Sequence, residues 1–309
     1  MNMIPLMGMG TFIGIEADHV QNLTQRYSLT TEMIYSALAK GYRHIDLAEN
    51  YHNLPAVAAA LTQAFQPLSA NGLGLKREDI WLTMKAVQPY TDAHITELLN
   101  AVGVGYFDLF LIHFPTAGGL FDDKETLTAK WRALAQMGQD KIKRIGVSNF
   151  YEPHLQRLLA VCEEEELPFP YANQCLINPW APNTSLVDFC EAHGIGVMAY
   201  SPLGYAYAPL ILADDTLQTI AKELNATPAQ VVLAWLMKKE IRVIPKTNHH
   251  ERLVENYDSQ RLVPLLTPEH MHAIDGITPP FPMSTDTSES CEKHGNDLSW
   301  GNAARLGMN

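Results

Sequence analysis

The stretch GIGVMAY, residues 194–200, is apolar along its whole length until a tyrosine ends it. Such a run fits a strand that is covered on both faces, as the strands of a parallel sheet are. Similar short runs recur along the chain, separated by longer segments with helical spacing. The eight candidate strands are YRHID (42–46), DIWLTMK (79–85), FDLFLIH (107–113), RIGVSN (144–149), YANQCLI (171–177), GIGVMAY (194–200), IRVIPK (241–246) and, with the weakest pattern, SQRLV (259–263).

This alternation of strands and helical segments predicts the fold class. Eight βα units within about 270 residues fit a (β/α)8 barrel. The rival is a doubly wound sheet, which needs a glycine-rich phosphate turn after its first strand. GMGTF (8–12) has no good GxGxxG continuation and precedes the first unit. We therefore expect a barrel, and because no Pro/Gly-rich linker divides the chain, a single domain over residues 1–309.

Several helix ends carry recognisable signals. Thr30 and Thr31 precede EMIYSALAKG (32–41), with Gly41 as the expected stop. Thr227 followed by proline predicts a capped helix start, and so does Thr267 followed by proline.

Composition narrows the possible partners. The chain has 309 residues, 47% hydrophobic and 18% charged, with a net charge of −12. Such a surface repels nucleic acid and anionic membranes, so a bound phosphate needs a local cationic site. The four cysteines form no CxxC pair, which fits free thiols in a reducing compartment. The first basic residue is Arg26 and no apolar run reaches about 18 residues, so we expect a cytoplasmic protein.

Polar side chains recur where the candidate strands end. In a barrel the carboxyl ends of the strands form one face, and active sites are built there. A single polar residue at a strand end is usually a cap or a satisfied hydrogen bond, but a ring of them predicts a site. The residues are Asp46, Lys85, His113, Ser148, Asn149, Gln174, Tyr200 and Lys246.

The order and spacing of several motifs resemble the aldo-keto reductase family over about residues 4–275. IPLMGMGT (4–11) resembles the N-terminal hairpin, here within residues 1–15, that closes the bottom of such a barrel. The other matching motifs are YRHIDLAENYHN (42–53), LTMKA (82–86), LFLIHFP (109–115), RIGVSNF (144–150), NQCLINPW (173–180), MAYSPLG (198–204), TPAQVVLAWL (227–236) and IPKTNHHERLVEN (244–256).

The resemblance implies reduction of an aldehyde or ketone by NADPH, with Asp46, Tyr51, Lys85 and His113 as the catalytic tetrad. The chemistry is sound, because a carbonyl oxygen that gains negative charge needs an acid to protonate it. A free tyrosine has a pKa of about 10, so we expect Lys85 to stabilise the phenolate of Tyr51 and lower this pKa. Asp46 then holds Lys85 charged and in place, and His113 either hydrogen-bonds the substrate oxygen or passes a proton.

The resemblance also implies how NADPH/NADP+ is held. Ser148, Asn149 and Gln174 match contacts to the carboxamide of the nicotinamide, and Tyr200 matches the residue that stacks on its ring. The cationic residues near 250 match a 2′-phosphate site, which favours NADPH over NADH. The further cofactor residues are Ser201 and Leu203 near the pyrophosphate, Lys246, Thr247 and Arg252 at the 2′-phosphate, Glu255 and Asn256 at the adenine, and Thr11.

The expected substrate pocket is aromatic and moderately apolar, and it predicts activity on small-molecule aldehydes, including aryl or sugar-like ones. Phe12 and Phe114 stand where the family commonly has tryptophan, and His52-Asn53-Leu54-Pro55 departs from the usual Asn-Glu after the tyrosine. Trp180 and Trp300 complete the candidate lining. The tail 279–309 is either an ordered lid over the barrel mouth or a disordered segment.

Two other function classes remain open. One is a regulatory subunit that binds the cofactor with little turnover, and the other is a barrel isomerase or lyase that binds phosphate. The histidines His249, His250, His270 and His272 lack a convincing ligand set, so no metal site is expected. A monomer is the family habit.

Overall fold

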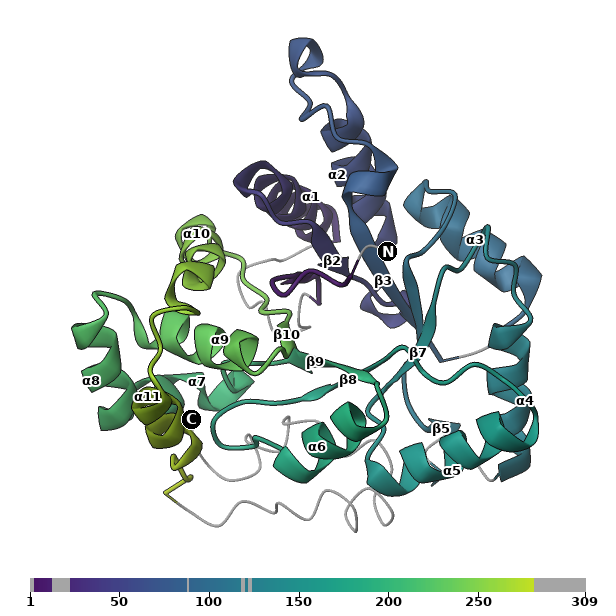
Figure 1. Cartoon of the computed structure of the whole chain (residues 1–309). Coiled ribbons are helices and arrows are strands. Elements are labelled where there is room, and N and C mark those ends of the chain that lie inside the picture. Colours follow the sequence, from purple (N-terminus) through teal and green to yellow (C-terminus); the bar gives the residue numbers. More distant parts are fainter. Residues whose placement is uncertain (1–2, 13–22, 88, 118–119, 122–123, 281–309) are drawn as a thin grey trace.

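Parallel strands at the centre of the molecule form a barrel surrounded by helices. The computed structural model describes residues 3–12, 23–87, 89–117, 120–121 and 124–280. Within these residues one sheet has eight strands in the order β1-β2-β3-β4-β7-β8-β9-β10, and all neighbouring pairs are parallel (Figure 1). A parallel bridge from Met7 to Val243 brings the two ends of this order together. The predicted (β/α)8 fold class is confirmed.

The strands are short, and each continues into a loop at its carboxyl end. Their bounds are β1 (Met9–Gly10), β2 (His44–Asp46), β3 (Trp81–Ala86), β4 (Leu109–Ile112), β7 (Ile145–Ser148), β8 (Ala172–Leu176), β9 (Gly196–Tyr200) and β10 (Arg242–Val243). A separate antiparallel pair follows β4, made of β5 (Thr116–Ala117) and β6 (Leu120–Phe121).

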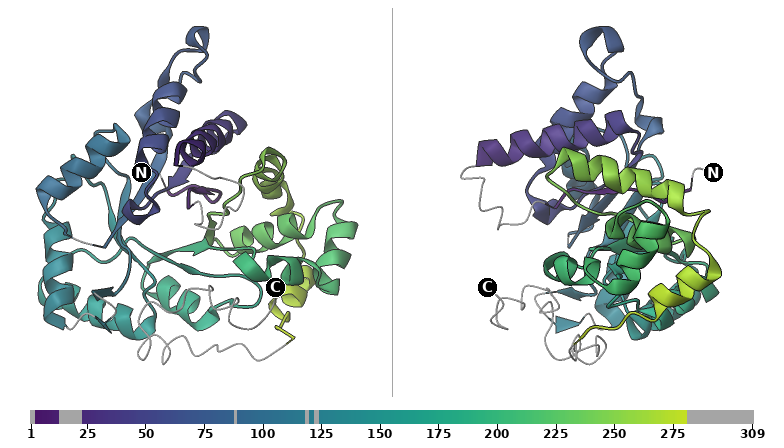
Figure 2. Two further views of the ribbon diagram at one scale, coloured as in Figure 1. Left: turned by 180° about the vertical axis from the view of Figure 1, so that it is seen from behind. Right: turned by 90° about the vertical axis from the view of Figure 1, so that its left-hand side faces the viewer.

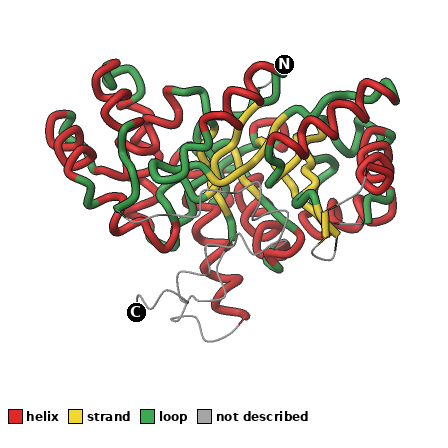
Figure 3. Tube along the Cα trace, turned by 90° about the horizontal axis from the view of Figure 1, so that it is seen from below, coloured by secondary structure: helices red, strands yellow, loops and turns green. Residues whose placement is uncertain are grey.

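Helices lie around the strands (Figure 1), and in a second view the strands occupy the middle with helices to both sides (Figure 3). Their bounds are α1 (Leu23–Lys40), α2 (Leu54–Phe65), α3 (Asp92–Val102), α4 (Lys124–Ala135), α5 (Glu152–Glu164), α6 (Thr184–Ala192), α7 (Ala208–Leu212), α8 (Asp215–Glu223), α9 (Pro228–Lys238), α10 (His250–Asp258) and α11 (Pro268–Asp275). Short 3-10 turns are η1 (Glu49–Tyr51), η2 (Leu68–Ala70), η3 (Arg77–Asp79), η4 (Tyr205–Tyr207) and η5 (Ser259–Leu262). Figure 2 shows that α2 and the turn after it project beyond the other helices. Of the helices described here, none has the length and apolar character needed to cross a membrane.

Seven of the eight predicted strands are confirmed, and the eighth is wrong. SQRLV forms η5, because Ser259 and Leu262 are buried against neighbouring helices rather than alternating across a sheet. The missing strand comes from the N-terminus, where Met9 and Gly10 pair in parallel with Ile45 and Asp46. Residues 7–10 therefore form parallel pairs with β2 and Val243, and not the expected hairpin. Two alternating glycines made this short strand hard to recognise, since glycine disfavours strands.

The helix starts were predicted with mixed success. Thr227 and Thr267 each accept a hydrogen bond from the backbone N–H three residues later, which confirms both caps. Gly41 ends α1 with a positive φ of 121°, as expected. The start of α1 is wrong, because Thr30 lies inside the helix and donates its hydroxyl to the Arg26 carbonyl oxygen.

The lower end of the barrel interior is filled by a small apolar cluster. Ile4 packs there with side chains from four of the strands, namely Trp81 of β3, Leu109 and Leu111 of β4, Ala172 of β8 and Met198 of β9. The N-terminal segment thus plugs the bottom of the barrel, as its resemblance implied, but through a side chain instead of a hairpin. A plugged bottom leaves the carboxyl ends of the strands as the open face.

Candidate active site

Asp46 is the centre of a buried polar cluster inside the barrel. Lys85 Nζ lies 2.6 Å from Asp46 Oδ2, and both side chains are almost completely buried. From β8, four strands away in the sheet order, Gln174 Nε2 donates to Asp46 Oδ1 at 2.7 Å. The carboxylate therefore points across the interior, and both of its oxygens are bound. A buried charge needs such partners, because leaving it unpaired is costly.

Tyr51 lies beside this pair. It ends η1, the turn that follows β2, and Lys85 Nζ stands 5.1 Å from the centre of its ring. The His113 ring, just after β4, meets Tyr51 edge-on with 6.2 Å between ring centres. The four predicted catalytic side chains are thus brought together at the open face, although 67 residues separate Asp46 from His113 along the chain.

The pKa of Tyr51 is raised, whereas the sequence led us to expect that Lys85 lowers it. Burial raises its pKa well above the usual value of 10, and the charges of Asp46 and Tyr200 act in the same direction. Lys85 does not lower it overall, because the lysine is paired with Asp46 and makes no hydrogen bond to Tyr51 within the described residues. Burial also lowers the pKa of Lys85 itself, against the opposing effect of Asp46. Tyr51 is consequently a protonated phenol at neutral pH.

His113 is held as a neutral ring. Burial, with a contribution from the charge of Lys85, lowers its pKa to about 3. Phe114 stacks on it with 4.3 Å between ring centres and 10° between planes. Its Nδ1 is buried and has no partner among the described residues. A neutral imidazole next to a protonated phenol can offer two hydrogen-bond donors to one carbonyl oxygen.

The candidate nicotinamide residues form a connected network. Tyr200 donates its hydroxyl to Asn149 Oδ1 at 2.8 Å, and Asn149 Nδ2 donates to the His113 carbonyl oxygen at 2.9 Å. Ser148 Oγ donates to the backbone oxygen of Gln174 at 2.9 Å. Asn149 has a positive φ of 63°, a conformation that asparagine tolerates better than most residues. The amides at these strand ends thus have fixed orientations.

The turn after β9 is tight. Ser201 has a φ of 47°, and the Gly204 N–H donates to the Ser201 carbonyl oxygen at 2.9 Å. Gly204 also has a positive φ, and a Cβ there would overlap Ile211. Leu203 is half-buried and packs on the core. This turn brings Ser201 and Leu203 directly beyond Tyr200, where the resemblance places the pyrophosphate.

Two cations flank the start of α10. Lys246 follows β10, and Arg252 lies in the first turn of the helix. Among the residues that the structure describes, neither has an acidic partner. Lys246 is exposed, yet desolvation by the surrounding protein lowers its pKa. Unpaired cations at a helix N-terminus fit the phosphate groups of a nucleotide cofactor.

The two predicted adenine residues are engaged within the protein. Glu255 Oε1 accepts the Thr227 hydroxyl at 2.5 Å, and its backbone oxygen accepts from Gln230 Nε2 at 2.9 Å. Asn256 is buried, and its carbonyl oxygen accepts from Ser259 Oγ. Glu255 therefore ties α10 to the cap of α9.

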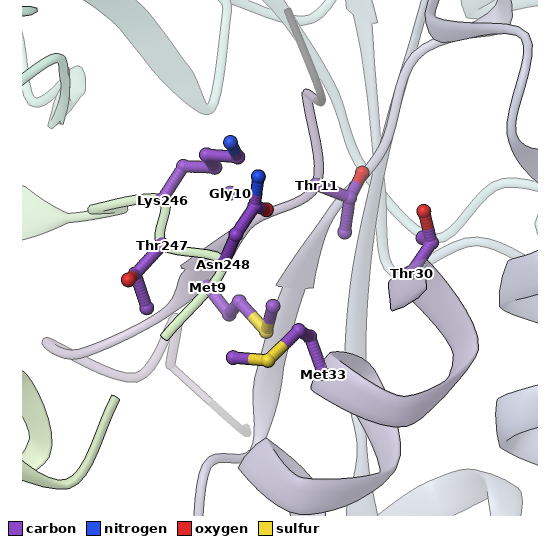
Figure 4. Close-up of a pocket in the computed structure, with 8 residues that line it drawn as sticks. All are labelled: Met9, Gly10, Thr11, Thr30, Met33, Lys246, Thr247 and Asn248. Atoms are coloured by element: carbon purple, nitrogen blue, oxygen red, sulfur yellow. The ribbon is translucent and has the colours of Figure 1, made fainter. Parts of the chain in front are cut away.

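A pocket lies between the end of β1, the middle of α1 and the segment after β10 (Figure 4). Two methionine side chains line it together with polar groups, among them Thr11, Lys246 and Thr247, which were predicted to hold the cofactor. Thr11 donates its hydroxyl to the Asp46 backbone oxygen at 2.8 Å. The full lining is Met9, Gly10, Thr11, Thr30, Met33, Lys246, Thr247 and Asn248.

Of the predicted substrate-pocket aromatics, two lie at the cluster. The Phe12 ring is 5.0 Å from the Tyr51 ring, and Phe114 stacks on His113 as described. Trp180 is 4% exposed and packs against Tyr207, with 5.8 Å between ring centres. Trp300 and most of the tail lie outside the described residues.

Some contacts have no signal in the sequence. The Gln174 bond to Asp46 spans 128 positions, and a second example is the 2.8 Å contact between Glu49 Oε1 and His94 Nε2. Neither pair has a motif or a spacing that predicts it. Only the closure of the barrel brings such residues together.

Comparisons with known proteins agree with this geometry. The model of the Aldo/keto reductase family matches residues 7–279. The chain is 33% identical over 261 residues to D/L-glyceraldehyde reductase of Hypocrea jecorina, covering 74% of this chain and 75% of that protein. It is 34% identical over 254 residues to 9,11-endoperoxide prostaglandin H2 reductase of Trypanosoma cruzi, covering 80% and 82%.

Solved structures show the same relationship. Aldose reductase from Giardia lamblia superposes with a TM-score of 0.73 at 33% identity, over 89% of this chain and 92% of that one. The aldo-keto reductase MGS-M4 from a Medee basin deep-sea metagenome library gives 0.75 at 30% identity, over 92% and 96%. With its barrel, its site geometry and these matches, the chain belongs to the aldo/keto reductase family, whose members are oxidoreductases that reduce carbonyl groups.

Proposed function

We propose that this protein reduces aldehydes or ketones to alcohols with NADPH, and that Tyr51 is the general acid. One observation carries the proposal: the half-buried phenol of Tyr51 lies beside the Asp46–Lys85 pair and next to the ring of His113. When bound, NADPH supplies the hydride that reaches the carbonyl carbon. The protein must then stabilise and protonate the carbonyl oxygen.

The four side chains have separate roles in this proposal. Tyr51 donates its hydroxyl proton to the carbonyl oxygen. His113 donates a hydrogen bond from Nε2 to the same oxygen, which its neutral state permits. Lys85 stabilises the tyrosinate left after proton transfer, and Asp46 keeps the lysine in place. Gln174 holds the second oxygen of Asp46 and so preserves the direction of the pair.

The proposed preference for NADPH over NADH rests on the start of α10. Lys246 and Arg252 lack acidic partners among the described residues, and the helix N-terminus adds its dipole. Thr247 lies between them. An additional phosphate on the cofactor satisfies these cations, whereas a free ribose hydroxyl does not. The remaining proposed contacts are Thr11, Ser148, Asn149, Gln174, Tyr200, Ser201, Leu203, Glu255 and Asn256.

The proposed substrates are aldehydes with an aryl or small sugar-like group. Phe12 beside Tyr51 and Phe114 on His113 place aromatic faces next to the reacting position. Flat apolar groups pack well against such faces.

The test follows NADPH absorbance with 4-nitrobenzaldehyde and compares the wild type with Tyr51→Phe. The variant removes only the proton donor, so we expect at least a hundredfold loss of kcat, within the range for general acid catalysis. NADPH binding, followed by fluorescence quenching, should be unchanged.

Two results contradict the proposal. A Tyr51→Phe variant as active as the wild type excludes Tyr51 as the acid. A wild type that binds NADPH but turns over no carbonyl favours the regulatory class instead.

A further inference from the structure

His94 connects the turn that carries Tyr51 to the loop that follows β3. It lies in the first turn of α3, and its side chain is 10% exposed. Its Nε2 is 2.8 Å from Glu49 Oε1, and its Nδ1 makes a short hydrogen bond to the Pro89 carbonyl oxygen. Glu49 begins η1, and Tyr51 ends it. One imidazole therefore joins the turn that carries Tyr51 to the loop that follows β3, the strand that carries Lys85.

The partners of the ring determine its charge state. A carbonyl oxygen and a carboxylate can only accept hydrogen bonds, so both ring nitrogens must carry a proton. His94 is satisfied on both sides only as an imidazolium. A neutral ring that keeps its proton on Nδ1 would turn a nitrogen lone pair towards the Glu49 carboxylate, and the contact would become repulsive.

The surroundings of His94 favour its protonated, positively charged form overall. Burial disfavours it, but the hydrogen bonds to Glu49 and Pro89 and the charges of Glu49 and Glu97 raise the pKa of His94 overall. Asp92, also in the first turn of α3, is paired with Lys141. The helix N-terminus opposes a cation there. The neighbouring helix α2 carries no charged residue.

Apart from the packing of the Tyr51 ring against Phe12, His113 and Lys85, η1 has few side-chain contacts to other elements. Among the described residues, the contact of Glu49 with His94 is the only side-chain hydrogen bond that joins this turn to another element. The cap of η1 at Ala48 has no side-chain hydrogen bond. The position of the Tyr51 hydroxyl relative to Lys85 therefore depends on this pair more than on any other polar contact of the turn.

We propose that His94 and Glu49 are positioning residues for Tyr51, so that the rate of reduction depends on the protonation of His94. This inference rests on the proposed function. The sign follows from linkage. Because the pKa is raised in the folded protein, the pair is fully formed below about 6.5 and is lost as pH rises through the folded value. Activity should consequently contain an alkaline limb that belongs to His94.

The experiment compares wild type, Glu49→Gln and His94→Gln in kcat and KM from about pH 5 to pH 9, with an NMR titration of His94 in the first two. In Glu49→Gln the amide can bond His94 in either charge state, so His94 should titrate at lower pH and the alkaline limb assigned to it should flatten. At about pH 6 we expect kcat to fall about fivefold, which corresponds to about 1 kcal/mol. KM for NADPH should not change.

The variant His94→Gln distinguishes an effect of His94 protonation from a purely structural effect of the side chain. His94→Gln keeps one donor but cannot titrate, so the limb assigned to His94 should be absent from its profile. Glu223→Gln is the matched control, because Glu223 makes a similar contact with His270, 3.1 Å long, between α8 and α11, which carry no proposed site residue. Its kcat profile should equal that of the wild type.

The possible failures are distinguishable. If the wild type reduces the aldehyde and Glu49→Gln keeps its kcat and its alkaline limb, this inference is wrong and the proposed function stands. A His94 that titrates equally in both proteins also overturns it. A wild type without turnover overturns the proposed function, and the rate dependence inferred here falls with it.

Discussion

At the scale of single residues, the buried pair of Asp46 and Lys85 dominates the site. The lysine ammonium and both carboxylate oxygens are bound inside the barrel. Such a pair contributes little net stability compared with apolar residues, but removal of one partner leaves an uncompensated buried charge. Its presence is therefore better explained by chemistry at Tyr51 than by stability.

We expect Lys85→Met to lower the free energy of unfolding by about 3 kcal/mol, because Asp46 is then buried without its cation. The double variant Asp46→Asn/Lys85→Met should recover part of this loss, since no charge is left. Urea unfolding of the three proteins measures both effects. A double variant less stable than Lys85→Met would contradict this account.

A second prediction at the scale of single residues concerns His44 and the stability of the protein in acid. It is completely buried, its Nε2 is 3.0 Å from Thr83 Oγ1, and burial, aided by Lys85, lowers its pKa to about 3. The pKa of His44 in the unfolded chain is about 6.5, so between about pH 6.5 and pH 3 the unfolded chain binds a proton that the folded protein does not bind. Stability should fall as pH drops from about 6.5 towards 3.

The variant His44→Gln retains a polar group for Thr83 and cannot titrate. At about pH 5 the contribution of His44 to acid destabilisation is about 2 kcal/mol. The loss of unfolding free energy between neutral pH and pH 5 should therefore be smaller in the variant by about this amount. Chemical unfolding at the two pH values tests it, and equal losses in both proteins would exclude His44 as a cause.

At the scale of elements, the start of α10 combines a helix dipole with two cations. Lys246 lies in the loop that follows β10, and Arg252 lies in the first turn of α10. By contrast, Glu255 on the same helix is used internally, in the 2.5 Å bond from Thr227. One helix thus serves both packing and the proposed cofactor site.

Arg252→Ala should weaken NADPH binding about tenfold or more, because a charge-assisted hydrogen bond to phosphate contributes about 1.5–3 kcal/mol. Binding of NADH should be little affected. Titration of both cofactors by fluorescence quenching measures the ratio. Arg261→Ala is the control, since Arg261 lies on η5 and donates to the Asn225 carbonyl oxygen, outside the proposed site. Equal losses for the two cofactors would remove Arg252 from the 2′-phosphate site.

At the scale of the whole molecule, glycines allow the barrel to close. β1 lies between β2 and the segment around β10, and the Gly8 N–H donates to the Val243 carbonyl oxygen at 2.8 Å. A Cβ on Gly8 would stand 2.5 Å from His44 Nδ1. The same glycines that hid this strand from its sequence pattern are what let it pack there.

Gly8→Ala should therefore destabilise the protein by about 2 kcal/mol, as overpacking of a buried site does. Gly105→Ala is the matched control, because a Cβ on Gly105 meets no atom within 4 Å. Thermal unfolding compares the two. If Gly8→Ala is no less stable than Gly105→Ala, close packing at β1 does not limit the closure of the barrel.

The sequence alone determined the architecture and the composition of the site. Runs such as GIGVMAY are apolar because both faces of the strand are covered. A strand of this kind can therefore be recognised from the sequence alone. Strand ends with Asp46, Lys85 and His113 indicated one face, and the structure brings these side chains together. Helix starts with threonine and proline were equally local and were also confirmed.

Only the tertiary structure decided which segment closes the barrel and how the site residues are charged. SQRLV forms a 3-10 turn and Met9–Gly10 forms a strand, although neither segment has a clear local pattern. The residues that pack against each segment decide which structure it forms. The raised pKa of Tyr51 and the contact of His94 with Glu49 depend on burial and on partners distant in sequence. Burial and electrostatics act through space, so no spacing along the chain encodes them.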